Sequence, residues 1–167
     1  MKTAIYYATS AGTTADIASR IARALGVDAS DVYDVATAAP STVAGYDRLI
    51  LGSPTYGAGE LPGTMDDFLH GLEVLDLRGK TVALFGDGDE SMSDTFCSAV
   101  GEMYRRLRPT GATFTGAFTS EPYDYTHSEA VADGPDNLGR VACGLLIDQV
   151  NRPELTDDRI ARWVATL

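Results

Sequence analysis

The sequence predicts an α/β domain in which a doubly wound parallel sheet is covered by helices on both faces. The chain has 167 residues, about the length of one domain, and its 44% hydrophobic and 22% charged residues are typical of a globular protein. Short apolar runs alternate with stretches whose apolar residues recur at helical spacing, the pattern of strands joined by right-handed helical crossovers. We therefore expect one domain over residues 1–167.

The first half of the chain contains three predicted strands. Residues 4–8, 32–35 and 48–52 are short apolar runs, and a break at residues 53–55 ends the third. The first helix is predicted by Ile17, Ile21 and Leu25 at helical spacing. The second helix, after Pro62, is predicted by Phe68, Leu69 and Leu72.

The second half continues the alternation. Residues 81–85 form the clearest buried strand, and an acidic loop follows it. The next helix has a predicted apolar face made of Phe96, Val100, Tyr104 and Leu107, and ends at Pro109 and Gly111. Residues 112–118 predict a fifth strand, and residues 145–147 another strand-like piece. The polar insert between them, residues 119–142, is interpreted either as a partner-docking surface or as a stabilising loop.

The last helix has clear start and packing signals. Thr156 is placed to cap it, and Asp157 and Asp158 suit the positive end of its dipole. Its predicted core face consists of Ile160, Trp163, Val164 and Leu167.

The charge and the cysteines narrow the function classes. Thirteen Lys and Arg against 24 Asp and Glu give a net charge of −11, which disfavours nucleic-acid and membrane-surface roles. The N-terminal apolar run is too short for a signal sequence or membrane span, so we expect a cytoplasmic protein. Cys97 and Cys143 lack CxxC spacing and are expected to be inert, buried thiols.

In such sheets ligands bind beyond the carboxyl ends of the strands, which directs attention to three loops. The first, Thr9 to Thr14, has no Lys or Arg but four hydroxyl residues and Gly12. Its backbone N–H groups, hydroxyls and helix dipole suit a phosphate group, although an ordinary Ser/Thr helix cap would have the same composition. The pattern GxxxxGK[ST] is missing, which disfavours a nucleotide triphosphatase.

The other two loops follow the third and fourth predicted strands. In residues 53–62, Tyr56 precedes two glycines and is interpreted either as a flat stacking surface or as a partly buried loop anchor. Residues 86–94 contain four carboxylates, Asp87, Asp89, Glu90 and Asp94, but match neither the calcium-loop pattern nor GxGxxG.

Taken together, the three loops resemble those of flavodoxins, the small FMN-binding electron carriers. Residues 9–14 are similar to the family's phosphate loop, residues 54–61 to its first flavin loop, and residues 86–90 to its second. Residues 121–125, 145–148 and 152–160 with Trp163 resemble the long-chain subgroup. The resemblance implies a five-stranded sheet of order 2-1-3-4-5 whose fifth strand is split by the insert.

The resemblance also implies roles for individual residues. Thr9, Ser10, Gly12, Thr13 and Thr14 would surround the FMN phosphate. Tyr56 would stack on the isoalloxazine ring, Thr55 would face the ribityl chain, and the Gly57 peptide would rotate to accept a hydrogen bond from flavin N5–H in the semiquinone. The backbones of Asp89 and Glu90 would contact the pyrimidine edge, with Asp148 near the ribityl chain. The complete expected cofactor site is Thr9, Ser10, Ala11, Gly12, Thr13, Thr14, Pro54, Thr55, Tyr56, Gly57, Ala58, Gly59, Gly86, Asp87, Gly88, Asp89, Glu90, Met92 and Asp148.

Two departures from the family pattern affect this site. Ala11 replaces a hydroxyl residue of the phosphate loop, which removes a hydrogen bond worth about 1.5 to 3 kcal/mol if nothing substitutes for it. The family usually carries a Tyr after the Gly-x-Gly-Asp-x stretch, but Ser91-Met92-Ser93 contains no aromatic ring. Met92 then either covers the ring through a sulfur–aromatic contact or leaves the outer face more exposed.

The expected function is a low-potential one-electron carrier that uses the semiquinone/hydroquinone couple of FMN. Carboxylates around the flavin disfavour its anionic hydroquinone, and an acidic surface steers basic partners. We expect a monomer that shuttles electrons between a reductase with a basic face and low-potential acceptors. The alternative is an FMN-dependent NAD(P)H:quinone oxidoreductase of the same fold. A receiver-type signalling domain would need acidic residues at the end of the first strand, which reads Tyr6-Tyr7-Ala8.

Overall fold

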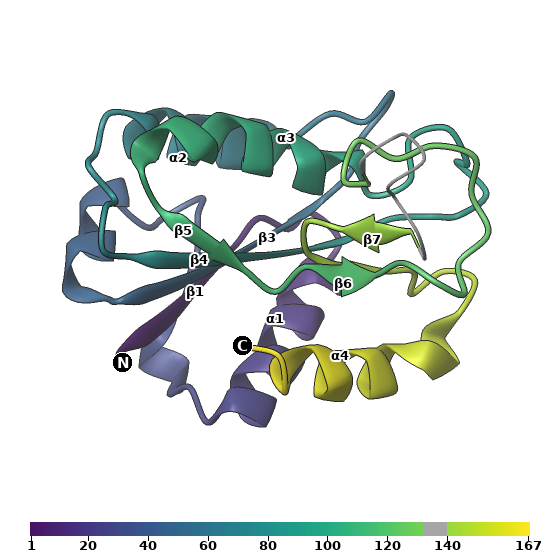
Figure 1. Ribbon diagram of the computed structural model, residues 1–167, viewed down its shortest axis with the longest axis horizontal. Coiled ribbons are helices and arrows are strands. Elements are labelled where there is room, and N and C mark those ends of the chain that lie inside the picture. Colours follow the sequence, from purple (N-terminus) through teal and green to yellow (C-terminus); the bar gives the residue numbers. More distant parts are fainter. Residues whose placement is uncertain (132–139) are drawn as a thin grey trace.

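In the computed structural model, which describes residues 1–131 and 140–167, a sheet lies between two layers of helices (Figure 1). Helices α1 (Thr13–Leu25) and α4 (Thr156–Val164) cover one face of the sheet. Helices α2 (Gly63–Glu73) and α3 (Ser98–Leu107) cover the other. The predicted doubly wound α/β fold is confirmed.

The sheet is parallel and has five positions. Strands β1 (Thr3–Tyr7), β2 (Val32–Asp34), β3 (Arg48–Pro54) and β4 (Thr81–Asp87) lie in the order β2-β1-β3-β4. The fifth position is shared, because β5 (Thr113–Thr115) pairs with the first residues of β4 and β8 (Leu145–Ile147) with the last. The order 2-1-3-4-5 and the split fifth strand are therefore confirmed.

The predicted fifth strand, residues 112–118, is shorter than expected. It ends at Thr115 because Gly116 adopts a positive φ of 80°, and the Trp163 indole N–H donates a 2.8 Å hydrogen bond to the Gly116 carbonyl. The chain then leaves the sheet and forms a small antiparallel pair, β6 (Phe118–Thr119) with β7 (Val141–Ala142). Residues 132–139 of the predicted insert lie outside the described residues.

Two other sequence-based predictions were wrong. The third strand does not stop before residues 53–55 but pairs with β4 as far as Pro54, which a proline tolerates at the end of a strand. Thr156 does not cap α4. A short 3₁₀ turn, η4 (Pro153–Leu155), leads directly into that helix, so Thr156 is its buried first residue and its hydroxyl donates to the Gln149 side chain instead.

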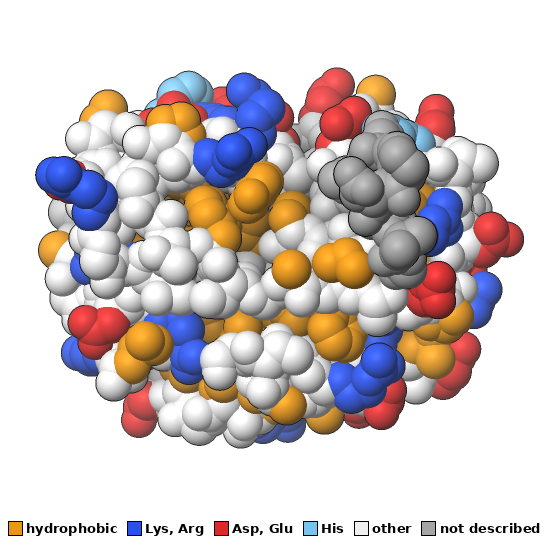
Figure 2. All heavy atoms as spheres, viewed as in Figure 1, with side chains coloured by type: hydrophobic (Ala, Val, Ile, Leu, Met, Phe, Trp, Pro, Cys, Tyr) orange, Lys and Arg blue, Asp and Glu red, His pale blue; other side chains and the backbone are white. Residues whose placement is uncertain are grey.

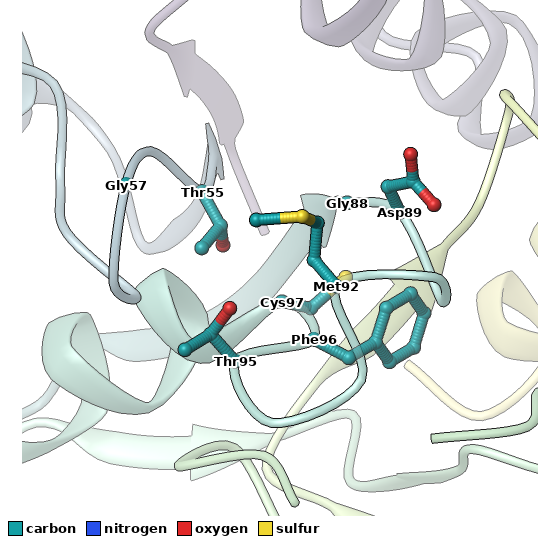
Figure 3. Close-up of a pocket in the computed structure, with 8 residues that line it drawn as sticks. All are labelled: Thr55, Gly57, Gly88, Asp89, Met92, Thr95, Phe96 and Cys97. Carbon is teal, nitrogen blue, oxygen red and sulfur yellow. The ribbon is translucent and has the colours of Figure 1, made fainter. Parts of the chain in front are cut away.

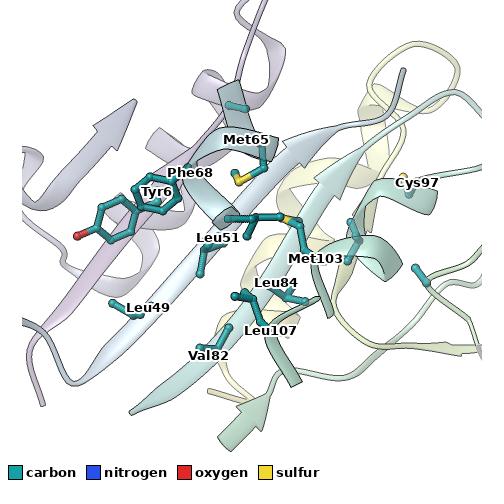
Figure 4. Packing of buried hydrophobic residues seen from close by; sticks show 14 of the residues in the cluster. Tyr6, Leu49, Leu51, Met65, Phe68, Val82, Leu84, Cys97, Met103 and Leu107 are labelled. Carbon is teal, nitrogen blue, oxygen red and sulfur yellow. The ribbon is translucent and has the colours of Figure 1, made fainter. Parts of the chain in front are cut away.

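Both faces of the sheet are packed. Figure 4 shows the α2/α3 side, where Tyr6, Leu51, Phe68 and Leu84 lie among its buried side chains. On the α1/α4 side the core contains Ile17, Ile21, Ala83, Phe85, Ile160 and Trp163. A Cβ on Gly52 would lie 2.0 Å from the Phe85 ring, so only glycine allows this ring to lie across β3. This packing fixes the strand ends on which the loops are mounted.

The predicted core differs in several details, and Val164 and Leu167 of the last helix are only partly buried. Phe96 is buried but precedes α3, and Tyr104 is only partly buried. Cys97 is fully buried, as expected, whereas Cys143 is only partly buried; neither forms a disulfide.

On the face seen in Figure 2, acidic and basic side chains are interspersed around an apolar middle, so the negative net charge is not gathered there. None of the helices in the described parts is long and apolar enough to span a membrane.

Candidate functional site

The loops that follow β1, β3 and β4 lie beyond the carboxyl ends of adjacent parallel strands. Two of them enclose a cavity of about 80 Å³ (Figure 3). Thr55 and Gly57 line it from the β3 loop, and Asp89 and Met92 from the β4 loop. The Met92 side chain extends across the cavity towards Thr55 (Figure 3).

The first loop leads directly into α1. Gly12 occupies the N-cap position with a positive φ of 92°, a conformation that favours glycine, and no side chain caps the helix. The ordinary Ser/Thr cap, the alternative interpretation of this loop, is therefore not formed. The Gly12 N–H instead donates to the Thr9 hydroxyl at 3.0 Å, while Ser10 and Ala11 are exposed. An uncapped helix N-terminus beside hydroxyl groups is suited to an anion.

Thr14, the last residue of this loop, is bonded to the end of β4. Its hydroxyl donates a 2.6 Å hydrogen bond to the carboxylate of Asp87, and both residues are buried. Burial raises the pKa of Asp87, and the hydrogen bond from Thr14 opposes part of that rise. The first and third loops are thus joined by one short, buried contact.

The second loop is a closed turn. Tyr56 and Glu60 exchange backbone hydrogen bonds of 2.8 and 2.6 Å, and Gly57 and Gly59 between them have positive φ angles of 49° and 97°. The Tyr56 side chain is 37% exposed, and its ring contacts no other aromatic ring among the described residues. These features favour the stacking-surface interpretation of Tyr56 over the buried loop anchor.

Thr55 joins the second loop to α3. Its hydroxyl accepts a 3.1 Å hydrogen bond from the Ala99 N–H in the first turn of that helix. The bond fixes the Thr55 side chain at the edge of the cavity.

The third loop is held by its own carboxylates. Asp89 accepts hydrogen bonds from the N–H and hydroxyl of Ser91 and from the Asn151 side chain, at 2.8, 2.5 and 2.7 Å. The bonds from Ser91, followed by that from Asn151, lower the pKa of Asp89. Glu90 accepts from the Asp124 N–H at 2.8 Å and from Arg152 at 2.9 Å. The side chains of Asp89 and Glu90 are therefore engaged in shaping the loop.

Asp148 lies beneath this loop with no exposed surface. Its two carboxylate oxygens accept four hydrogen bonds of 2.8 to 2.9 Å, from the N–H groups of Glu90, Val150 and Asn151 and from the Asn151 amide. The expected proximity of Asp148 to the ribityl chain stays a prediction. The structure shows a carboxylate that fastens the third loop to the turn after β8.

Several residues that support the site were not predicted. Asn151 bridges Asp89 and Asp148; its spacing from Asp148 is a signal for a local turn, but nothing in the sequence indicates the bond to Asp89. Arg159 is 1% exposed and donates to the carbonyls of Leu146, Glu121 and Thr119. Burial lowers its pKa. Arg159 has no sequence signal, because a charged residue in a helix is ordinarily exposed.

The described part of the insert packs against the third loop. The Phe96 ring lies 5.3 Å from the Tyr123 ring and 5.0 Å from the Tyr125 ring, and the N–H groups of Thr126 and His127 donate to the Ser93 carbonyl. These contacts support the interpretation of the insert as a stabilising loop.

Cys97 also lines the cavity. Burial, with a smaller effect from the negative charge of Asp87, raises its pKa well above the ordinary value, and burial raises the pKa of Cys143 to about 12. Both thiols are therefore protonated at neutral pH, as expected of inert cysteines.

Comparison with known proteins identifies the family. The family model for flavodoxin matches residues 5–163. This chain belongs to the flavodoxin family. It is similar to flavodoxin 1 of Salmonella typhimurium, with 39% identity over 163 residues that cover 97% of this chain and 90% of that one. Flavodoxin 1 of Azotobacter vinelandii is 36% identical over 168 residues, covering 98% and 93%.

A solved flavodoxin, that of Fusobacterium nucleatum bound to flavin mononucleotide, superposes with a TM-score of 0.87 at 30% identity. The match covers 99% of this chain and 96% of that one. The resemblance to long-chain flavodoxins is thereby confirmed, and with it the class of function, an FMN-binding electron carrier rather than an enzyme with its own substrate. Flavodoxins work between a reductase and an electron acceptor, so partners of both kinds are implied.

The residues present fit FMN. The uncapped N-terminus of α1 and the hydroxyls before it supply donors for a phosphate group, and exposed Tyr56 supplies a flat apolar surface. The cavity of about 80 Å³ is smaller than a typical ligand pocket of roughly 300 Å³ or more, so it admits only part of a flavin. Tyr56, between the lining residues Thr55 and Gly57, and Met92, which lines the cavity, are exposed and available for further contact.

Proposed function

We propose that this chain is a low-potential one-electron carrier that holds FMN among the loops after β1, β3 and β4. The observation that carries the proposal is the joint placement of an uncapped, hydroxyl-rich helix N-terminus, an exposed Tyr56 and a glycine turn at one edge of the sheet. FMN, when bound, supplies the redox chemistry itself. The chain binds the cofactor, orients it and sets the charge around it.

Each loop has its own task in this proposal. Thr9, Ser10, Ala11, Gly12, Thr13 and Thr14 hold the phosphate, chiefly through backbone N–H groups and hydroxyls. Pro54, Thr55, Tyr56, Gly57, Ala58 and Gly59 lie along one side of the flavin, with Tyr56 against its ring. Gly86, Asp87, Gly88, Asp89, Glu90 and Met92 form the other side, and Asp148 supports them. Gly57 is the residue whose peptide changes orientation with the redox state, since glycine adopts both backbone conformations at little cost.

The low potential follows from charge. Asp89 and the exposed Asp94 in the third loop, with the exposed Glu60 in the second, add negative charge around the flavin, and Glu90 adds less because it is paired with Arg152. Each tenfold loss of affinity on one-electron reduction lowers the potential by about 59 mV. A negatively charged surrounding therefore disfavours the fully reduced, anionic cofactor and makes it a strong reductant.

The same charge selects the partners. With a net charge of −11, the chain suits a reductase with a basic docking face and electron acceptors of low potential. We propose that it acts as a single-domain monomer in the cytoplasm, where its two free thiols would stay reduced. The rival assignment, an NAD(P)H:quinone oxidoreductase, predicts steady-state NADPH oxidation without an added reductase, whereas a carrier shows none.

Two variants of the apoprotein test the proposed site, with FMN and riboflavin as paired ligands. Thr13→Ala removes a phosphate-loop hydroxyl and weakens FMN binding without changing the Kd of riboflavin, which has no phosphate. Tyr56→Leu removes the stacking surface and weakens both ligands by about threefold to tenfold, while Tyr56→Phe keeps the ring and binds as the parent does. If Thr13→Ala weakened riboflavin as much as FMN, the phosphate would not lie in this loop.

A further inference from the structure

Thr14, a residue of the proposed phosphate loop, is hydrogen-bonded to the carboxylate of Asp87. Thr14 Oγ1 lies 2.6 Å from Asp87 Oδ1, and the two residues are 1% and 9% exposed. Thr14 is the second residue of α1, and Asp87 is the last residue of β4. The bond joins residues 73 positions apart in the sequence, so it is a product of the fold.

A threonine hydroxyl carries a single proton. An ionised carboxylate can only accept, so Thr14 must donate its proton to Asp87 while Asp87 is charged. The proton is then not free for a phosphate oxygen. The buried carboxylate also adds a negative charge beside the loop, where no Lys or Arg of residues 9–14 offsets it.

We propose that Asp87 sets how tightly this chain holds the phosphate of FMN, because it competes with that phosphate for the hydroxyl proton of Thr14. The inference rests on the proposed phosphate loop. A neutral Asp87 carboxyl removes the competition, since it donates its own proton to Thr14 Oγ1 and leaves the Thr14 proton available. Where Asp87 is ionised in the free protein and neutral in the complex, binding of FMN therefore takes up a proton at Asp87.

The surroundings of Asp87 favour this exchange. Burial already raises the pKa of Asp87, and a phosphate bound nearby raises it further through repulsion of like charges. The titratable and charged side chains on the elements around the end of β4 include Tyr7 at the end of β1, Asp16 and Arg20 on α1, Cys97 before α3, Asp148 after β8 and Arg159 on α4. Of these, Cys97 interacts electrostatically with Asp87 but stays a neutral thiol.

The sign of the pH dependence follows. Below the pKa of Asp87 in the free protein, the carboxyl is neutral with or without FMN, and the affinity is at its maximum. As the pH rises between the pKa of the free protein and the higher pKa of the complex, the affinity falls by up to about tenfold per pH unit. Riboflavin, which has no phosphate, shows no such fall.

The test compares the Kd values of FMN and riboflavin for the parent chain and Asp87→Asn from about pH 5 to about pH 8. Asparagine is the same size, is neutral at every pH and donates to Thr14 through its amide. At the highest pH, we expect Asp87→Asn to bind FMN about tenfold more tightly than the parent chain. The ratio of the two Kd values should shrink as the pH falls. The phosphate of FMN titrates at about pH 6 with both proteins, so its effect cancels in this ratio.

The matched control is Asp16→Asn, which makes the same charge change at an exposed position of α1. It should change the Kd of FMN by less than about twofold. Calorimetry in buffers of different ionisation enthalpy provides an independent measurement, because FMN binding should take up more protons in the parent chain than in Asp87→Asn, whereas riboflavin binding should show no such difference.

The outcomes separate the two claims. If FMN binds more tightly than riboflavin, but with the same ratio in the parent and Asp87→Asn at every pH, the role of Asp87 is refuted and the phosphate loop is retained. If FMN and riboflavin bind equally in all variants, the phosphate loop itself is refuted, and the role of Asp87 with it. Equal proton uptake by the parent chain and Asp87→Asn on FMN binding at every pH tested would also overturn the inference.

Discussion

The carboxylate of Asp148 accepts a 2.9 Å hydrogen bond from the backbone N–H of Glu90, 58 residues earlier in the chain. Through this bond the turn between β8 and α4 holds the third loop of the site against the sheet. The same carboxylate accepts hydrogen bonds from Val150 and Asn151, so one buried charge organises two segments. The split fifth strand thereby contributes directly to the geometry of the proposed flavin site.

Replacing Asp148 should loosen this loop. In Asp148→Asn an amide replaces one acceptor oxygen, which leaves two of the four N–H donors facing another donor. We expect the free energy of unfolding of the apoprotein to fall by about 2 kcal/mol or more, and the affinities for FMN and riboflavin to fall together. Urea unfolding and ligand titration measure both effects. Asp94→Asn, an equal charge change at an exposed position of the same loop, is the control; a loss of affinity confined to FMN would contradict this role.

A substitution at the exposed Ala11 should increase the affinity for FMN. Ala11→Thr restores a hydroxyl to the phosphate loop and should tighten FMN binding by roughly tenfold, the effect of one hydrogen bond to a charged group. The Kd of riboflavin should not change. Ala11→Val has the shape of threonine without the hydroxyl, so an equal gain with valine would show that the hydroxyl is not responsible.

Arg159 should be needed for the insert to dock. Its guanidinium donates to the carbonyls of Leu146, Glu121 and Thr119, and Arg159→Met leaves these groups without that donor. We expect a loss of about 3 kcal/mol or more in unfolding free energy, with faster amide hydrogen exchange in residues 118–131. The comparison is Arg162→Met, an exposed arginine on the same helix. Equal effects of the two substitutions would mean that the buried contacts of Arg159 add nothing to the free energy of unfolding.

The two aspartates of the third loop should affect stability with opposite sign. The pKa of Asp87 is raised in the folded apoprotein, so its contribution is present below its unfolded pKa and is lost as the pH rises through the folded value. Asp87→Asn should therefore be more stable than the parent near neutral pH, by a margin that shrinks in acid. The pKa of Asp89 is lowered, so Asp89→Asn should be less stable near neutral pH, and its deficit should shrink as the pH falls. Urea unfolding from about pH 4 to about pH 7 tests both; a margin for Asp87→Asn that grows in acid would contradict the assignment.

Local patterns predicted much of the fold and the position of the site. The apolar runs predicted the central strands, and the loops after three of them were predicted as the site. The sequence could not predict contacts made by tertiary packing, such as Thr14 with Asp87 or the burial of Arg159. Thr156 failed as a predicted cap because a 3₁₀ turn before it moved the start of the helix, which local composition does not reveal. The end of β5 depends on Gly116 and on its bond to a tryptophan 47 residues away.

The central claim is that the chain holds FMN as a one-electron carrier, and stepwise dithionite reduction of the FMN-loaded protein tests it most directly. We expect the absorbance spectrum to pass from yellow through a blue one-electron-reduced form before it bleaches, which requires two well-separated one-electron potentials. Direct bleaching in a single two-electron step, with no blue form at any degree of reduction, would contradict the account.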